Sequence, residues 1–324
     1  MNATRAIGLV PNAAVQRAAR WAMLLGAAAM LSAALSLPLE AQSGGPAGSV
    51  TSAPSDYVGW EVCQGCHIAQ VTAWKETKMG KVMLGKPRND LEAKACEACH
   101  GGAREHVAAK GDTTKIFRFT KASPATVAEK NERCLQCHQK GAQAQWDGSM
   151  HESRNIACVQ CHTIMKSVSP ELALAKTNVV DVCAQCHVQR KAQTLLSSHM
   201  PVREGKVTCV SCHNPHGSTG PKLLVQNSVN EVCYTCHAER RGPFLWEHPP
   251  VTENCINCHE PHGSINDNLL KVRAPRLCQQ CHIDVQHPGT PQTATARFAF
   301  NRSCTNCHSQ LHGSNHPSGA RFHR

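Results

Sequence analysis

Twenty cysteines and twenty histidines stand out in this chain of 324 residues, and the cysteines all follow one rule. Every cysteine belongs to a Cys-x-x-Cys-His motif, which places two thiols close together and an imidazole directly after them. The ten motifs begin at Cys63, Cys96, Cys134, Cys158, Cys183, Cys209, Cys233, Cys255, Cys278 and Cys304. Two thiols at this spacing can add across two vinyl groups while the imidazole ligates iron, which is the chemistry of c-type haem attachment.

Three other uses of cysteine fit the pattern less well. Structural zinc sites use Cys-x-x-Cys pairs but have no reason to place a histidine directly after every pair. A disulfide framework would show varied cysteine spacings and would not need the histidines. A thioredoxin-like redox motif would not recur along the whole chain. The repetition therefore predicts covalent haem.

We predict ten haem c groups, each held by one motif. The predicted thioether cysteines are Cys63, Cys66, Cys96, Cys99, Cys134, Cys137, Cys158, Cys161, Cys183, Cys186, Cys209, Cys212, Cys233, Cys236, Cys255, Cys258, Cys278, Cys281, Cys304 and Cys307. The predicted proximal iron ligands are His67, His100, His138, His162, His187, His213, His237, His259, His282 and His308.

The motifs fall into five pairs, and each pair defines a repeat unit with two further candidate iron ligands. Units 1 to 5 are residues 63–106, 134–165, 183–216, 233–262 and 278–312. After the first motif of each unit come Met79, His151, His199, His248 and His287. After the second motif come His106, Met165, His216, His262 and His312. A ligand so close behind its own motif is tethered to the near side of its own haem, so we expect it to reach a neighbouring haem.

Methionine occupies two of these ten distal positions. Met79 lies five residues after Trp74, and the histidine candidate of unit 2 likewise lies five residues after Trp146. Met165 stands where the copies "CVSCHNPHG" and "CINCHEPHG" have histidine. Position therefore favours thioether ligation at both sites, which would give two His/Met haems. The alternative is that a spare histidine ligates the iron and the methionine only packs.

Four residues near these positions are left without a predicted ligand role. Met83 and Met150 lack the registration to a tryptophan and are expected to be packing residues. His316 and His323 remain beyond the last motif, with His316 a reserve ligand for unit 5.

The elements that must position these ligands are short. A helix is expected to open at Ser123-Pro124, with serine as its N-cap, and to run into Cys134. The stretches "TNVVDVCAQCH" and "NSVNEVCYTCH" predict one or two helical turns that enter a motif. Aromatic residues make up only 4% of the chain, too few for a large core. The predicted fold is a multihaem cytochrome c of loops and short α-helices wrapped around an elongated chain of ten haems, with little β-structure.

Residues 1–41 have the pattern of an export signal. Three arginines precede the apolar stretch Trp21–Leu37, and "LPLEA" offers a cleavage site near Ala41. The alternative is an uncleaved membrane anchor, because the apolar stretch is long for a signal. Residues 42–59 are predicted to be a flexible linker, and residues 60–324 to be the decahaem cytochrome domain.

The formal charge of +11 does not indicate a nucleic-acid partner. The basic residues do not alternate with aromatic residues, as single-strand binding would require. Haem propionates would offset the positive charge, and export would remove the protein from nucleic acid.

With ten Cys-x-x-Cys-His motifs, the "CHxPHG" trailers and the ending "CTNCHSQLHGSNHPSG", the chain resembles the decahaem cytochromes of outer-membrane porin–cytochrome conduits, the MtrA/DmsE/PioA type. The resemblance covers about residues 58–318. It implies a periplasmic cytochrome inside an outer-membrane β-barrel porin, which exchanges electrons with a periplasmic cytochrome and with an extracellular multihaem cytochrome or mineral. Met79 and Met165 depart from the family, which uses histidine there.

Electron transfer without bond chemistry is the favoured function, since every iron can be given two protein ligands. A soluble periplasmic carrier that feeds a reductase is the first alternative. The second is a multihaem reductase acting on nitrite, hydroxylamine or a sulfur oxyanion, which would need an iron with a vacant distal face.

Overall fold

The structure, a computed structural model, describes residues 52–283 and 303–323. These residues belong to a single folded region, Thr51–Arg324. The predicted signal at residues 1–41 and the predicted ligand His287 lie outside the described residues. Within the described ranges, no helix combines the length and the apolar character that crossing a membrane requires.

Short helices and loops make up this region, as predicted. The longest helix has nine residues, and the described residues contain isolated β-bridges but no strand. The α-helices are α2 (Trp60–Cys66), α3 (Ile68–Lys75), α4 (Lys78–Gly85), α5 (Asp90–Ala93), α6 (Cys96–His100), α7 (Arg104–Ala108), α8 (Val127–Leu135), α9 (Cys158–Cys161), α10 (Val179–Cys183), α11 (Val188–Gln193), α12 (Cys209–Cys212), α13 (Val229–Tyr234), α14 (Pro249–Glu253) and α15 (Arg276–Gln279). Single 3-10 turns are η1 (Pro54–Asp56), η2 (Thr113–Lys115), η3 (Gly141–Gln143), η4 (Pro221–Leu223), η5 (Ala238–Arg240), η6 (Cys255–Asn257), η7 (Asp267–Leu269), η8 (Cys304–Asn306) and η9 (Gly319–Arg321).

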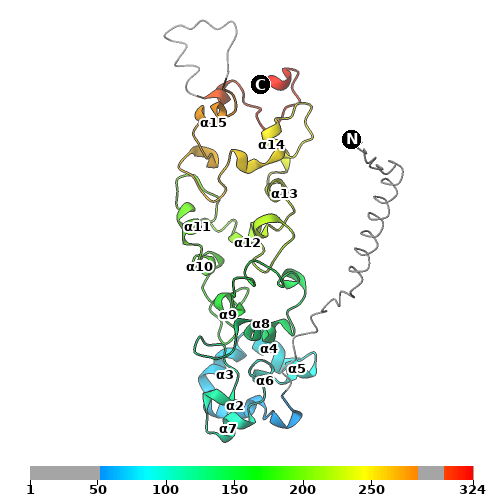
Figure 1. The fold of residues 1–324 in the computed structure, drawn as a ribbon, viewed down its shortest axis with the longest axis vertical. Coiled ribbons are helices and arrows are strands. Elements are labelled where there is room, and N and C mark those ends of the chain that lie inside the picture. The colour runs from blue at the N-terminus through cyan, green and yellow to red at the C-terminus, as the bar shows by residue number, and fades with distance from the viewer. Residues whose placement is uncertain (1–51, 284–302, 324) are drawn as a thin grey trace, which may run out of the picture. The chain divides into compact units, whose positions relative to one another are not determined.

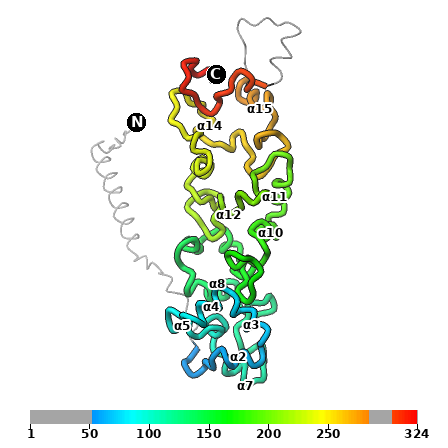
Figure 2. Tube along the Cα trace, turned by 180° about the vertical axis from the view of Figure 1, so that it is seen from behind, coloured from blue at the N-terminus to red at the C-terminus, as the bar shows by residue number. Residues whose placement is uncertain are grey.

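The repeat units follow one another in chain order through the folded region (Figures 1 and 2). Helices α2 and α7 lie near one end, and α14 and α15 lie near the other. Consecutive repeat units are therefore neighbours in space. At the boundary of units 1 and 2, α6 packs against α8, and α8 packs against α9 within unit 2.

Polar N-caps start the helices that lead into first motifs. The side chains of Asn178 and Ser228 accept hydrogen bonds from the first turns of α10 and α13, where the sequence predicted helical turns. The helix leading to Cys134 begins later than predicted. Its N-cap is Thr126 rather than Ser123, because Thr126 and Glu129 form a capping box in which each side chain bonds the other's backbone.

The folded region also begins earlier than predicted. Residues 52–59 were assigned to the flexible linker, yet their backbone is tied to unit 1. The Glu97 carboxylate accepts hydrogen bonds from the N–H groups of Val58 and Gly59, and the Ser52 hydroxyl accepts one from Gly102. Glu97 is 3% exposed, so these bonds satisfy a buried charge that would otherwise destabilise the fold.

Few apolar side chains are buried. Trp74, Met83, Ala95 and Ala98 form a small cluster in unit 1, and no large side chain among the described residues is less than 2% exposed. Met83 is thus a packing residue, as predicted. Met150 is 56% exposed and does not pack, because it lies on the outer side of a surface turn. The polypeptide alone supplies too little buried apolar surface to offset the entropy of ordering so many loops.

We therefore predict that haem attachment is required for folding. Expressed without the haem-attachment machinery, the mature chain should be largely unfolded, because the bound groups replace the missing core. Circular dichroism and limited proteolysis of the apo-chain would measure this. A compact apo-protein that melts cooperatively would contradict the prediction.

Candidate haem sites

The first cysteines of the two motifs in each unit lie against one another. A hydrogen bond between the two thiols is the main cause that raises the pKa of Cys134 and lowers that of Cys158. The five neighbouring pairs are Cys63–Cys96, Cys134–Cys158, Cys183–Cys209, Cys233–Cys255 and Cys278–Cys304. The attachment points of the two motifs within a unit are therefore adjacent.

The second cysteines connect one unit to the next. Burial raises the pKa of Cys161, and the nearby thiol of Cys186 in the following unit raises it further. The same electrostatic influence between nearby thiols recurs at each boundary, between Cys99 and Cys137, Cys161 and Cys186, Cys212 and Cys236, and Cys258 and Cys281. Neighbouring thiols within and between units together place all ten motifs in one uninterrupted series.

Backbone carbonyls orient the histidine of every second motif. Nδ1 of His213 donates a hydrogen bond to the Lys222 carbonyl over 3.0 Å. This bond fixes the neutral tautomer in which Nε2 carries the lone pair that ligates a metal. The corresponding bonds are His100 to Phe117, His162 to Leu172, His213 to Lys222, His259 to Asn268 and His308 to Arg321.

In units 2 to 4 these carbonyls belong to the loop that runs from the motif histidine to Leu174, Leu224 or Leu270, and we call this loop the backbone frame. In unit 3, Asn214 N–H donates to the Leu223 carbonyl and Val225 N–H donates to the Cys212 carbonyl. The two residues at the tip, Lys222 and Leu223, are left-handed, with φ of 55° and 61°. Sequence reasoning missed this frame. The signal was the leucine that recurs after each second motif, Leu174, Leu224 and Leu270, which forms a bridge to the motif histidine.

Unit 1 builds its frame from the long connection between residues 107 and 133, for which the sequence suggested no role. The Phe117 carbonyl accepts the hydrogen bond from His100, and the Phe119 ring packs edge-on against that imidazole at 5.6 Å. The Arg133 guanidinium lies 4.7 Å from the Phe117 ring centre. Burial lowers the pKa of His100 and so favours its neutral, metal-binding form.

Six motif histidines each face one of the predicted distal histidines at a nearly constant distance. In five of these pairs the ring planes are within 22° of parallel. The ring-centre distances are 6.2 Å for His67–His106, 6.3 Å for His187–His151, 5.9 Å for His162–His216, and 6.2 Å for His213–His262, His282–His248 and His259–His312.

One iron between two imidazole nitrogens fits this spacing. Metal–nitrogen bonds are about 2 Å long, and each nitrogen lies roughly 1 Å from its ring centre, so a central iron separates the centres by about 6 Å. The predicted distal rings are also held in place. Nδ1 of His151 donates to the Pro215 carbonyl over 2.7 Å, and Nδ1 of His106 donates to the Asp112 carbonyl over 2.8 Å. Burial lowers the pKa of His216, His248, His262 and His312.

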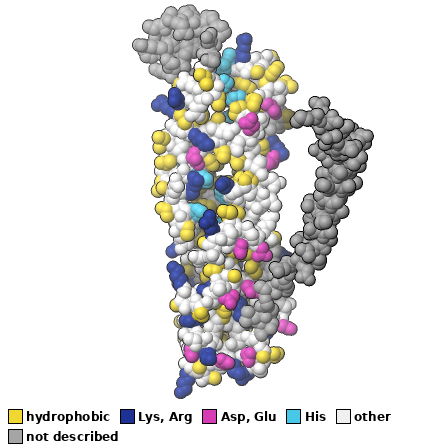
Figure 3. All heavy atoms as spheres, viewed as in Figure 1, with side chains coloured by type: hydrophobic (Ala, Val, Ile, Leu, Met, Phe, Trp, Pro, Cys, Tyr) yellow, Lys and Arg dark blue, Asp and Glu magenta, His cyan; other side chains and the backbone are white. Residues whose placement is uncertain are grey.

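Apolar side chains beside the first-motif histidines fit a porphyrin face. Ile68, Val188 and Ile283 directly follow motif histidines, yet they are 64%, 64% and 81% exposed. Their motif histidines are exposed as well, and Figure 3 shows histidine side chains reaching the surface between hydrophobic ones. A flat apolar macrocycle bound at such a histidine would cover this surface.

Most ring pairs join different units, and the exchange is reciprocal. At the boundary of units 2 and 3, His151 of unit 2 faces His187 of unit 3, while His216 of unit 3 faces His162 of unit 2. At the boundary of units 4 and 5, His248 and His312 cross over in the same two directions. Neither unit therefore holds both rings of these pairs by itself.

Glycines make the close approach at these boundaries possible. Gly263, directly after His262, has φ of +138°, and a Cβ there would lie 1.9 Å from the Gln193 carbonyl oxygen of the preceding unit. The neighbouring Ser264 forms a two-way backbone bridge with Ser198. The "PHG" trailer thus docks its distal histidine onto the previous unit.

Some predicted ligands are placed differently. His199 directs Nε2 at Arg203 and lies 3.7 Å from the Glu204 carboxylate instead of facing a motif histidine. The reserve ligand His316 accepts a hydrogen bond from Ser318 N–H at Nδ1. His323, for which the sequence gave no role, lies with its ring centre 4.5 Å from that of His308. In the sequence, only its position after the last unit could have indicated that it pairs with the last motif histidine.

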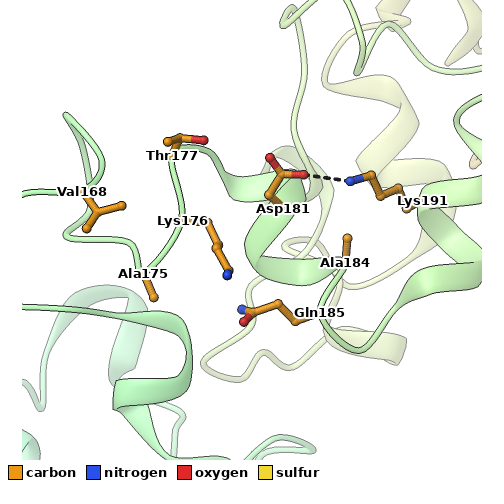
Figure 4. Close-up of a pocket in the computed structure, with 8 residues that line it drawn as sticks. All are labelled: Val168, Ala175, Lys176, Thr177, Asp181, Ala184, Gln185 and Lys191. Atoms are coloured by element: carbon orange, nitrogen blue, oxygen red, sulfur yellow. Dashed lines mark hydrogen bonds and ion pairs between the residues drawn. The ribbon is translucent and has the colours of Figure 1, made fainter.

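One surface hollow in the described part of the chain is not part of this series. It has a volume of about 480 Å³ and is lined by Val168, Ala175, Lys176, Thr177, Asp181, Ala184, Gln185 and Lys191, none of which is a cysteine or histidine. Lys176 and Gln185 extend into it, and Asp181 pairs with Lys191 over 2.8 Å (Figure 4). The chemistry of the chain is concentrated in the ring pairs, so the hollow is not the candidate site.

We predict that Gly263→Ala separates His262 from His213. The added methyl group would clash with the Gln193 carbonyl, so unfolding should become easier by about 1–3 kcal/mol and one six-coordinate haem should change its spectrum. Thermal unfolding and absorption spectra measure the two effects. Gly148→Ala is the matched control, because Gly148 also has positive φ, +77°, but open space around its Cβ. Equal effects of the two substitutions would show that backbone strain, not docking, is responsible.

Comparison with known proteins agrees with this geometry. Residues 199–242 and 248–287 match the doubled CXXCH motif family, and residues 96–186 match the NrfB-like cytochrome c-type proteins. The multihaem cytochrome MtrA of Shewanella baltica (strain OS185) is 41% identical over 275 residues, which cover 82% of this chain and 81% of that protein. Identity at this level over four fifths of both chains shows that the chain belongs to the MtrA family of multihaem c-type cytochromes.

Proposed function

We propose that this cytochrome carries ten haems and conducts electrons across the outer membrane, enclosed by a β-barrel porin partner. The observation that supports this most strongly is the uninterrupted series of neighbouring cysteine thiols, together with the ring pairs that cross the unit boundaries. Haems attached in such a series form a path for electrons from one end of the folded region to the other. The partners at the two ends would be a periplasmic cytochrome and an extracellular multihaem cytochrome or mineral.

The proposed proximal ligands are the ten motif histidines. Six distal ligands follow from the ring pairs described above, and His323 would serve the His308 iron after the rings separate by about 2 Å to admit a metal. His199 would serve His237, since it occupies the position that His151 and His248 occupy in their units. Met79 and Met165 complete the set. This set differs from the sequence prediction at one position, where His323 replaces His287.

Two protein ligands on every iron support electron transfer over catalysis. A reductase needs an iron whose distal face is open to substrate, together with acid–base groups beside it. Ten distal candidates are available for ten irons, so the set leaves no open iron. This also explains why the chain can use so little polypeptide for each haem.

We expect carbon monoxide not to bind the reduced native protein. The gas needs a vacant coordination position, and every iron in the proposed set has two side-chain ligands. An absorption titration of the reduced protein tests this, with the acid-denatured protein as the positive control. Stoichiometric binding to one haem under native conditions would instead favour the reductase.

The barrel partner distinguishes a conduit from a free carrier. We expect protease added to intact cells to leave most of the cytochrome uncut, and mild detergent to extract it together with a larger membrane protein. The physical reason is that a hydrocarbon layer tolerates irregular backbone only when other protein sheathes it. Recovery as a soluble monomer from osmotic-shock fluid, with none in the membrane fraction, would establish the free carrier instead.

A further inference from the structure

The exchange of rings at the unit boundaries follows a rule with two parts. The distal residue after a first motif serves the first motif of the next unit, as His151 does for His187 and His248 for His282. In the other direction, the distal residue after a second motif serves the second motif of the preceding unit. Three pairs show this: His216 with His162, His262 with His213, and His312 with His259.

Met79 lies in the same local structure as His151. In both places a tryptophan carbonyl accepts a hydrogen bond from the N–H three residues later, over 2.9 Å, at Thr77 and Ser149. The hydroxyl of that residue then accepts from the N–H three residues further on, in Gly80 and Glu152. The distal candidate sits two residues after the hydroxyl in each case. Trp74 and Trp146 are both buried, which anchors the two turns in the same way.

The residues around Met79 lie close to the motif that contains His138. Met79 and Cys99 both pack against the small cluster in unit 1. Cys99 lies beside Cys137, the thioether cysteine next to His138. Arg88 and Glu92, which follow α4, also act on the Cys137 thiol, so the segment that carries Met79 borders unit 2.

Met165 occupies the position of His216 within the backbone frame. Thr163 N–H donates to the Ala173 carbonyl as Asn214 N–H donates to the Leu223 carbonyl, both over 2.8 Å. Met165 lies two residues beyond Thr163, as His216 lies two residues beyond Asn214. The docking glycine is replaced by Lys166, so this boundary lacks the close backbone approach. The unbranched thioether side chain is more flexible than an imidazole and can adapt to a site without that glycine.

We propose that Met79 ligates the iron at His138 and that Met165 ligates the iron at His100. Both methionines then belong to one boundary, between units 1 and 2, and the two His/Met haems are direct neighbours through Cys99 and Cys137. This assignment rests on the proposed function only in requiring that ten haems are bound. Thioether ligation favours ferrous iron, so the two neighbours form one high-potential step, a single haem away from the end of the series at His67.

Substitution by histidine tests ligation at each methionine. Met79→His and Met165→His, alone and together, restore the ligand of the other units, and Met150→His, at an exposed methionine, is the matched control. Near-infrared magnetic circular dichroism of the purified oxidised protein separates His/Met from bis-His haems. We expect two His/Met signals in the natural protein and in the control, one in each single variant and none in the double variant. Ten bis-His signals in the natural protein would overturn the proposal.

Haem deletion tests which iron Met79 serves. In the Met165→His background one His/Met signal should remain, from Met79. Cys134→Ala with Cys137→Ala should abolish that signal, while Cys63→Ala with Cys66→Ala should leave it; the opposite result would assign Met79 to the haem of its own unit and overturn the exchange rule. If either deletion variant fails to fold, a redox titration of the natural protein still tests the thioether ligation that the assignment requires: two haems reduced ahead of the rest support the proposal, and one or none contradicts it. These measurements on the isolated cytochrome are independent of whether a barrel partner exists.

Discussion

The fixed distance between facing imidazole rings is the constraint on which the remaining structure depends. Ring centres about 6.2 Å apart are too far from each other for close packing, so the backbone must hold them there by other means. It does so with a carbonyl hydrogen bond at Nδ1 of one ring of the pair, as at His151 and His213, and with glycine-mediated docking between units. Because most pairs take one ring from each of two units, no repeat unit is complete alone, and the region must assemble as a whole.

The backbone frame behind each second motif trades local strain for ligand orientation. Non-glycine residues in the left-handed region cost about 1–2 kcal/mol each, and such pairs occur at Leu172 and Ala173 and again at Asn268 and Leu269. The cost is offset because the turn delivers a carbonyl to the motif histidine and closes two backbone hydrogen bonds. A metal ligand whose second nitrogen is bonded to a carbonyl is both oriented and made a better donor. Strain is thus located where it fixes the geometry of the candidate site.

Sequence reasoning identified what depends on covalent chemistry and local spacing. The motifs, the short capped helices before Cys183 and Cys233 and the scarcity of buried apolar residues all follow from neighbouring residues. Which distal ligand faces which motif does not, because it is decided by contacts between units. His106 faces the other motif of its own unit and closes the series at one end, whereas His216 crosses to the preceding unit. Spacing along the chain cannot distinguish these arrangements, and it gave no reason to consider His323.

Positive charge at the boundary of units 1 and 2 would raise the reduction potential of a haem there, as thioether ligation would. Arg133 is 8% exposed, and its positive charge adds to the effect of burial, which is the main cause that lowers the pKa of the nearby His100 ring. At Cys99 burial raises the thiol pKa, and the same positive charge partly offsets that rise. A buried positive charge disfavours a further positive charge beside it, so it stabilises ferrous over ferric iron just as it stabilises neutral over protonated imidazole. On the other side, Arg88 is paired with Glu92 and its field is largely cancelled. The His100 haem should therefore have the higher potential of the two neighbours, and electrons entering at His67 would meet it one step before the His138 haem.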